Sequence, residues 1–351
     1  GTFDFSELEA SIELGTDAGL PYALAISIGA FGYPEWLLSE LGAAYHTFSY
    51  QGQEWNLPLW WDTTVTSRLQ ALISALGEHY AADANLSHIY VSQMTTNGIE
   101  GHLNGVNMAA FASAGYTEER WIAAATSTTY QFADAFPDKP IVFEIHEIDQ
   151  DTIVPAAIIN DLYADPDLCE RVGLALWWLS GKTSYQTDLL TFIEHFPGDK
   201  YAQVIGRSDQ LHRFQDSTYA TVFEQAKQLG VRYMEPWPFE FSNHTHDDLL
   251  LDFNQWADQQ FSPQDTCGAI TNTEENSAAN QGMSLFPNPT AGEFHIELAT
   301  APTDFTVLVF DSTGRKVLAL DNSLTIDLSS YATGVYFIYL DGLSARIVKQ
   351  E

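Results

Sequence analysis

Over the first 261 residues, short apolar runs alternate with longer segments of helical spacing. The runs are rich in β-branched and aromatic residues, which is typical of buried strands, whereas the segments between them repeat apolar residues at helical intervals. The six runs are residues 22–28, 88–94, 141–145, 173–179, 201–205 and 231–237. The helical segments include residues 64–80, 117–136, 153–163 and 219–229. This alternation predicts an α/β unit built on a parallel sheet.

Small and bulky residues alternate within the first run. Ala23, Ala25 and Ser27 are small, while Leu24 and Ile26 are bulky. Such a strand can turn its small residues into a barrel and its bulky ones toward a layer of helices. No Gly-x-Gly-x-x-Gly turn follows the run, as it would in many open, doubly wound sheets. We therefore expect a (β/α)8 barrel of the TIM type rather than a doubly wound sheet, although only six of its eight strands can be counted.

From residue 283 onward the pattern changes to a period of two. Polar and apolar residues alternate in residues 293–298, 306–310 and 336–340, and turn-forming residues stand between these segments at 312–314 and 341–342. Alternation of this kind predicts half-buried strands joined by tight turns. We expect a small antiparallel β-sandwich. An immunoglobulin-like module for binding or spacing fits the same pattern.

Residues 262–282 separate the two patterned regions. They are poor in apolar residues and rich in Asn, Thr, Ser, Gln and Glu. Such a stretch cannot bury enough apolar surface to offset the entropy lost on ordering, so it is typical of a linker. The predicted organisation is a barrel at 1–261, a linker at 262–282 and a β-sandwich at 283–351.

Three motifs mark the last region. They are Pro-Asn-Pro-Thr-Ala-Gly at 287–292, Val-Phe-Asp-Ser-Thr-Gly-Arg at 309–315, and Ile-Asp-Leu-Ser at 326–329 followed by Gly-Val-Tyr at 334–336. In this order they resemble the C-terminal sorting domain of proteins exported by the type IX secretion system of Bacteroidota. The resemblance implies a secreted or outer-membrane cell-surface protein with the type IX machinery as a partner. It also implies a signal peptide, which the chain lacks, so that Gly1 would not be the translational start.

Charge and composition narrow the choice of partners. The 47 acidic and 14 basic residues give a net charge of -33, which argues against binding to nucleic acid or to anionic membranes. The acids are scattered rather than set in a calcium-loop spacing, so we expect a solvated acidic surface, with no metal and no cofactor. No apolar run approaches the roughly 20 residues of a transmembrane helix. Two cysteines, Cys169 and Cys267, suffice for one disulfide or two free thiols.

A second, looser resemblance concerns the first region. Gly-Thr-Phe-Asp-Phe-Ser at 1–6 and Pro-Glu-Trp-Leu at 34–37 are similar to segments that follow the second and third strands in barrel glycoside hydrolases related to β-galactosidases and clan A. The resemblance implies that the first two βα units precede Gly1. It also implies that the chain hydrolyses glycosidic bonds in an extracellular polysaccharide by carboxylate acid/base chemistry.

The same resemblance places residues 95–102 at the end of the fourth barrel strand, where it implies a general acid/base Glu directly after an Asn. Here Gly98 and Ile99 separate Asn97 from Glu100. We assign Glu100 as the general acid/base. A solvated loop glutamate remains the alternative.

A glycosidase of this type needs a second carboxylate. The resemblance implies a nucleophilic Glu at the end of the seventh strand, but residues 201–209 contain none. Our candidates are, in order, Glu235, Asp209 and Glu144. Glu235 could instead form an ion pair with Arg207 inside the barrel.

Tryptophans near the predicted strand ends could stack on a pyranose ring, while carboxylates and histidines bind its hydroxyl groups. The predicted substrate-binding residues are Asn97, His102, Glu144, His146, Trp61, Trp177, Arg207 and Trp237. Three hypotheses follow. The chain is a secreted glycoside hydrolase, an inactive barrel that binds glycans, or a structural component of the cell surface or an appendage.

Overall fold

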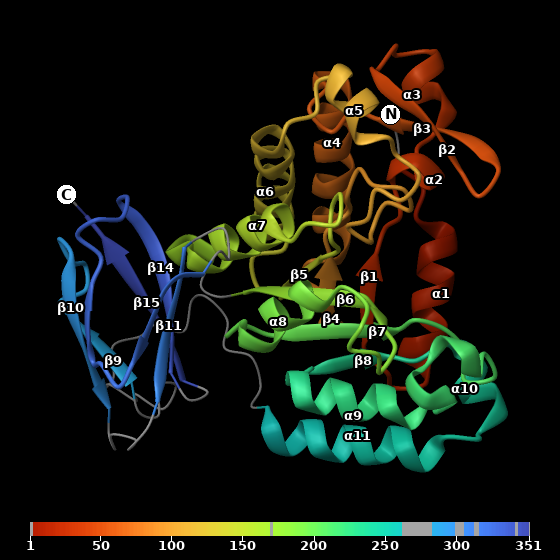
Figure 1. Ribbon diagram of the computed structural model, residues 1–351. Coiled ribbons are helices and arrows are strands. Elements are labelled where there is room, and N and C mark those ends of the chain that lie inside the picture. The colour runs from red at the N-terminus through yellow and green to blue at the C-terminus, as the bar shows by residue number, and fades with distance from the viewer. Residues whose placement is uncertain are drawn as a thin grey trace. The chain divides into compact units, whose positions relative to one another are not determined.

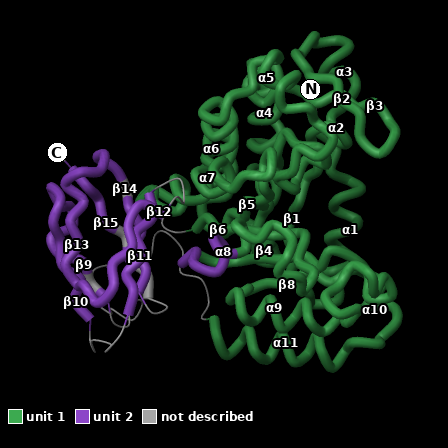
Figure 2. The backbone as a smooth tube through the Cα atoms, viewed as in Figure 1, with its two compact units in different colours: residues 1–190, 198–269 green, residues 191–197, 270–351 purple. Residues whose placement is uncertain are grey.

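The computed structural model describes residues 3–168, 171–261, 283–298, 305–311, 316–340 and 343–350. The chain divides into two compact units, residues 1–190 with 198–269 and residues 191–197 with 270–351 (Figure 2). The predicted linker at 262–282, Cys169, Cys267 and the predicted turns at 312–314 and 341–342 lie outside the described residues.

A six-stranded parallel sheet forms the centre of the first unit (Figure 1). Its strands follow the order of the chain: β1 (Tyr22–Ala25), β4 (Leu86–Tyr90), β5 (Ile141–Glu144), β6 (Val172–Leu179), β7 (Lys200–Val204) and β8 (Tyr233–Glu235). Each strand overlaps one of the six apolar runs. The β-branched and aromatic residues of those runs therefore form strands, as the pattern predicts.

The predicted closed (β/α)8 barrel is wrong. Among the described residues, β1 pairs only with β4 and β8 only with β7, so the sheet is an open half-barrel with two edge strands. The alternation of small and bulky residues indicates which face of a strand meets the helices. An open sheet and a closed barrel show the same alternation, so it does not distinguish them. Closure depends instead on the number of strands and on the pairing of the edges, which local patterns do not specify.

Helices precede, connect and follow the parallel strands. The longer ones are α1 (Ser6–Asp17), α4 (Thr63–Tyr80), α6 (Glu118–Ala135), α7 (Ile153–Ala164), α8 (Thr187–His195), α9 (Ala220–Leu229) and α11 (Asp247–Gln260). The shorter ones are α2 (Gly29–Gly32), α3 (Glu35–Ser39), α5 (Met108–Ser113) and α10 (Pro238–Asn243). Because parallel crossovers are right-handed and the strands follow one another in chain order, successive helices cover the same face of the sheet. Helices α4, α6 and α7 pack side by side there (Figure 1).

A buried tryptophan just before α4 joins two of the helices that cover the sheet. The indole Nε1 of Trp60 donates to Thr128 Oγ1 at 2.9 Å, and its ring meets Trp121 edge-on at 5.0 Å between centroids. Both tryptophans are almost completely buried. Asp62 then caps α4 by accepting a hydrogen bond from Thr64 N at 2.8 Å. These contacts join the start of α4 to α6.

The opposite, concave face carries ring-bearing and polar side chains. The ring of His88 lies 4.8 Å from that of Tyr201 and 4.6 Å from that of Tyr233, measured between centroids. Tyr90, two residues after His88 on β4, shares this face. The concave face therefore differs from the apolar helix-facing side, and it can form binding sites.

Several elements of the first unit were not among those named from the sequence. They include α1, α11 and an antiparallel hairpin of β2 (Tyr45–Tyr50) and β3 (Gln53–Pro58). The hairpin turns at Gln51 and Gly52, both of which have positive φ.

The second unit is an antiparallel β-sandwich, as predicted. One sheet has the order β13 (Thr325–Asp327), β10 (Glu293–Leu298), β9 (Met283–Phe286). The other has the order β12 (Lys316–Asp321), β11 (Thr306–Asp311), β14 (Gly334–Leu340), β15 (Leu343–Lys349). Phe294 and Ile296 of the first sheet share one core with Val307, Val309 and Ile338 of the second. The alternating apolar residues thus face inward from both sheets.

Two glycines hold the turn after β1 against the loop after β4. Gly29 has φ +68° and Gly98 has φ +86°, and a Cβ atom on Gly98 would lie 2.0 Å from the carbonyl oxygen of Ile28. Ala30 N donates to Thr95 O across the same contact at 3.0 Å. Only glycine fits such positions, because both the conformation and the space exclude a side chain.

We predict that Gly98→Ala destabilises the first unit by roughly 3 kcal/mol or more, because a methyl group would strike backbone atoms. The matched control is Gly19→Ala, where φ is +74° but nothing lies within 4 Å. That variant should lose only about 1–2 kcal/mol from the unfavourable conformation. Urea unfolding followed by tryptophan fluorescence measures the difference, since all 9 tryptophans precede residue 262. Equal losses would contradict the close approach.

Candidate functional site

Polar side chains from two strand ends meet in what we call the Glu100 cluster: Asn97, Glu100, His102, Glu144 and His146. Glu100, Glu144 and His146 each place a potential ligand atom within 4.8 Å of the others. The Nε2 atom of His102 lies 3.7 Å from Glu100 Oε2, and the rings of His102 and His146 are 5.3 Å apart. The structure therefore brings five of the predicted site residues together.

Asn97 shapes the loop that carries Glu100. Its side-chain oxygen accepts hydrogen bonds from Ile99 N at 3.2 Å and Glu100 N at 2.9 Å, and its amide group donates to the Glu100 carboxylate. Gln93 Nε2 anchors the same loop by donating to the carbonyl oxygens of Ile99 and Glu144, each at 2.8 Å. The two residues between Asn97 and Glu100 form a turn that returns the carboxylate to the Asn97 amide.

Glu144 is completely buried, and its carboxylate contacts residues from three segments of the chain. Its carboxylate accepts hydrogen bonds from Gly101 N at 2.6 Å and Trp177 N at 3.0 Å, and it lies 3.0 Å from His146 Nδ1. Burial and the neighbouring Glu100 carboxylate raise the pKa of Glu144 well above its ordinary value, although the backbone donors oppose this. Glu144 therefore orients its neighbours and is not exposed to a substrate.

The cluster holds a neutral imidazole beside an anionic carboxylate. Burial lowers the pKa of His146 to about 3, so its ring is neutral at physiological pH. Burial also acts to raise the pKa of Glu100, but the interactions of its carboxylate with His102, His146 and Asn97 outweigh this effect, so that the pKa lies below the ordinary value. The side chain of Glu100 is 23% exposed. An ionised, accessible carboxylate suits a base or a cation ligand rather than the acid that protonates a leaving group.

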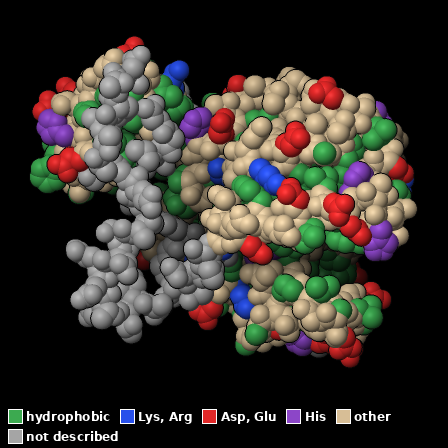
Figure 3. Space-filling view, turned by 90° about the horizontal axis from the view of Figure 1, so that it is seen from below, with side chains coloured by type: hydrophobic (Ala, Val, Ile, Leu, Met, Phe, Trp, Pro, Cys, Tyr) green, Lys and Arg blue, Asp and Glu red, His purple; other side chains and the backbone are tan. Residues whose placement is uncertain are grey.

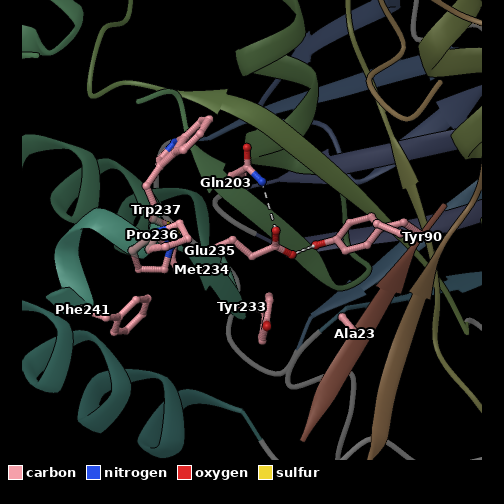
Figure 4. A pocket seen from close by; sticks show the side chains of 11 residues that line it. Ala23, Tyr90, Gln203, Tyr233, Met234, Glu235, Pro236, Trp237 and Phe241 are labelled. Carbon is pink, nitrogen blue, oxygen red and sulfur yellow. Dashed lines mark hydrogen bonds between the residues drawn. The ribbon is translucent and has the colours of Figure 1, made fainter. Parts of the chain in front are cut away.

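Two other predicted residues, Glu235 and Trp237, line a hollow of about 480 Å³, which we call the Glu235 pocket (Figure 4). Side chains from β1, β4, β7, β8 and α10 line it, so both edge strands of the half-barrel contribute to it. The residues used below are Tyr90, Gln203, Tyr233, Glu235, Trp237 and Phe241. Figure 4 shows Glu235 pointing toward Tyr90 and Gln203.

Two uncharged side chains bind the Glu235 carboxylate. Tyr90 Oη donates to Glu235 Oε1 at 2.5 Å, and Gln203 Nε2 donates to Oε2 at 3.2 Å. Burial raises the pKa of Glu235, and these hydrogen bonds oppose the shift only in part. The alternative ion pair with Arg207 does not form, because Arg207 binds Asp209 at 2.9 Å and lies over the ring of Phe239.

The remaining predicted residues occupy other places. Asp209 and Arg207 form their ion pair at the surface, with side chains 44% and 46% exposed. Trp61 packs 5.6 Å from the ring of Phe111 and beneath Arg120. Trp177 connects the two groups, because its backbone N–H binds Glu144 and its ring meets that of Tyr90 at 5.1 Å.

Sequence reasoning missed Tyr90 and Gln203 as members of the site. A tyrosine in an apolar run is typical of a core, so Tyr90 carried no distinguishing signal. Gln203 did carry one, since it is the polar residue inside the apolar run 201–205. A buried polar side chain needs a partner, and here the partner is Glu235.

Comparison with known proteins identifies the second unit. Residues 284–350 match the family model described as the secretion system C-terminal sorting domain, which confirms the resemblance of this region. The chain is therefore a secreted or cell-surface protein. No curated protein matches it, and the resemblance of the first region to glycoside hydrolases has no support from a family model. Among the described residues, no helix combines the length and apolar character needed to cross a membrane.

The raised pKa of Glu235 predicts how Glu235→Gln changes stability with pH. The folded state favours the protonated carboxyl, so its stabilising contribution is complete below the unfolded pKa and is lost as pH rises through the folded value. The variant should therefore gain stability relative to the wild type as pH rises from 4 to 8. Urea unfolding at a series of pH values measures this, with the exposed Glu40→Gln as control. If the difference in unfolding free energy between the variant and the wild type did not change with pH, the pKa of Glu235 would not be raised in the folded state.

Proposed function

We propose that this secreted protein binds a saccharide outside the cell and that the Glu235 pocket holds it. The observation that carries this proposal is the composition of the pocket, in which partly exposed aromatic rings surround a hydrogen-bonded carboxylate. Sugar-binding sites need both features, because a pyranose presents an apolar face as well as hydroxyl groups.

Three aromatic side chains offer accessible faces to such a ligand. Tyr233 is 37%, Trp237 40% and Phe241 56% exposed. Trp237 is also fixed in orientation, since its Nε1 donates to the carbonyl oxygen of Val204 at 2.7 Å. A ring held in place before binding loses little conformational entropy when a sugar stacks on it.

The polar groups of the pocket supply donors and acceptors for hydroxyl groups. Glu235 can accept further hydrogen bonds, and the side-chain oxygen of Gln203 has no partner among the described residues. The charge of the chain narrows the ligand class further. A net charge of -33 repels uronic and sulfated polysaccharides, and Figure 3 shows acidic side chains scattered over the face in view, with few Lys or Arg. We therefore propose a neutral saccharide.

The arrangement favours binding over hydrolysis. A glycosidase needs two accessible carboxylates on either side of the scissile bond. The acid beside Glu100 is Glu144, which is fully buried and occupied by three hydrogen-bonding groups. Glu235 is bound by Tyr90 and Gln203, and Asp209 by Arg207. Hydrolysis and a structural role at the cell surface stay predictions of the sequence.

Affinity electrophoresis of the full-length chain tests the proposal with neutral polysaccharides (β-glucan, xylan and mannan) and with anionic alginate and pectin. We expect retardation by at least one neutral polymer and by neither anionic one. Phe241→Ala and Trp237→Ala should each weaken binding roughly tenfold, which corresponds to about 1.4 kcal/mol for one stacked ring. Trp36→Ala removes a similarly exposed ring that does not line the pocket, and it should bind like the wild type.

Two outcomes would overturn the proposal. One is the absence of binding to every neutral polymer, and the other is undiminished binding by both pocket variants. Release of reducing ends in the same incubations, abolished by Glu100→Gln, would favour hydrolysis instead.

The sorting domain predicts the location of the chain in a bacterium that has the type IX secretion system. The complete chain should reach the cell surface or the medium, whereas a chain ending at residue 282 should remain inside the cell envelope, since it lacks residues 284–350. Immunoblotting of cell fractions measures this. The Phe241→Ala variant is the control and should be exported normally. Export of the shortened chain would contradict the assignment.

A further inference from the structure

The Glu100 cluster places two acidic side chains next to each other. Two carboxylates, Glu100 and Glu144, lie within 4.8 Å of each other and of His146, and burial removes most of the water that would screen them. Among the ion pairs of the described residues, neither acid is matched with Lys or Arg, and the ion-pair partner of each is a histidine. Buried like charges are costly unless a proton or a cation lies with them.

His146 is prepared to bind a cation. Its Nδ1 lies 3.0 Å from the Glu144 carboxylate, and in the tautomer in which Nδ1 donates to that carboxylate, Nε2 keeps its lone pair. Nε2 has no hydrogen-bond partner among the described residues, and the residue is only 5% exposed. A carboxylate that orients a histidine in this way is the usual support of a metal-ligating imidazole.

Glu100 and His102 approach the same imidazole from the loop after β4. The Glu100 carboxylate is the exposed one of the two acids, and His102 Nε2 lies 3.7 Å from its Oε2. The rings of His102 and His146 meet edge-on at 5.3 Å. His102 therefore joins the group through its approach to Glu100, so that two imidazoles and one partly exposed carboxylate lie together, while the oxygens of Glu144 are already engaged by hydrogen-bond donors.

The backbone holds these groups in place. Gly101 N donates to Glu144, and a Cβ atom on Gly101 would lie 3.1 Å from the backbone nitrogen of His146. The loop that carries Glu100 and His102 thus lies directly against β5. Ligands fixed by short backbone contacts lose little entropy when they bind an ion.

We propose that Glu100, His102 and His146 bind one divalent cation of the zinc class, with Glu144 orienting the His146 imidazole. The donor set decides the class of metal. Imidazole nitrogens suit Zn²⁺, whereas Ca²⁺ and Mg²⁺ prefer oxygen ligands throughout. This site is separate from the Glu235 pocket, and its test does not involve a saccharide.

The experiment uses the full-length chain, freed of metal by dialysis against a chelator and titrated with Zn²⁺ in competition with a chromophoric zinc indicator. We expect one tight site per chain that millimolar Ca²⁺ and Mg²⁺ do not displace. Glu100→Gln and His146→Gln should each weaken Zn²⁺ binding at least a hundredfold. Glu144→Gln should weaken it roughly tenfold, because it changes only the support of a ligand.

The matched control is His244→Gln. His244 lies 3.0 Å from Asp247 at the surface, so it reports adventitious binding by an exposed His–Asp pair. This variant should bind like the wild type. Circular dichroism checks folding, and if His146→Gln fails to fold, Glu100→Gln carries the test because that side chain is partly exposed. Absence of the tight site, wild-type affinity in Glu100→Gln, or displacement by Ca²⁺ would overturn the proposal.

Discussion

A single buried carboxylate organises the first unit. Glu144, at the end of β5, binds the loop after β4 through Gly101 and the following strand through Trp177, and it also orients His146. Removing it would leave two backbone donors without a partner inside the protein, which is far more costly than the loss of an exposed ion pair. Together with Gln93, which anchors the same loop, this side chain holds Glu100 against His146.

The open sheet provides two different surfaces from one set of strands. Strands that follow chain order place their helices on one side, so the other side is free to carry rings and polar groups. Trp177 links the two groups found there, since its backbone binds Glu144 and its ring packs on Tyr90, which binds Glu235. The sandwich, which matches the sorting domain over residues 284–350, carries the signal for export. The proposed binding site and the sorting domain thus lie in different units.

Sequence patterns predicted the positions of the strands more reliably than they predicted the architecture that the strands form. All six apolar runs contain a strand, because buried β-branched residues leave a strong local signal, yet the expected closed barrel is an open half-barrel. The hairpin at residues 45–58 was missed because its alternation is weak. It pairs Tyr45, His46 and Thr47 with Pro58, Leu57 and Asn56, so few of its residues are strongly apolar. In the sandwich, by contrast, clean alternation marked β10, β11 and β14 correctly.

By itself, the sequence determined the βα alternation, the sorting domain and the local loop in which Asn97 binds Glu100 three residues later. These depend on contacts between near neighbours. Only the tertiary structure decided that Glu144 lies beside Glu100, that Arg207 binds Asp209, and that Tyr90 binds Glu235, 145 residues away. Such partners are chosen by the register of parallel strands. Register is set by packing over the whole sheet, and no short segment of the chain records it.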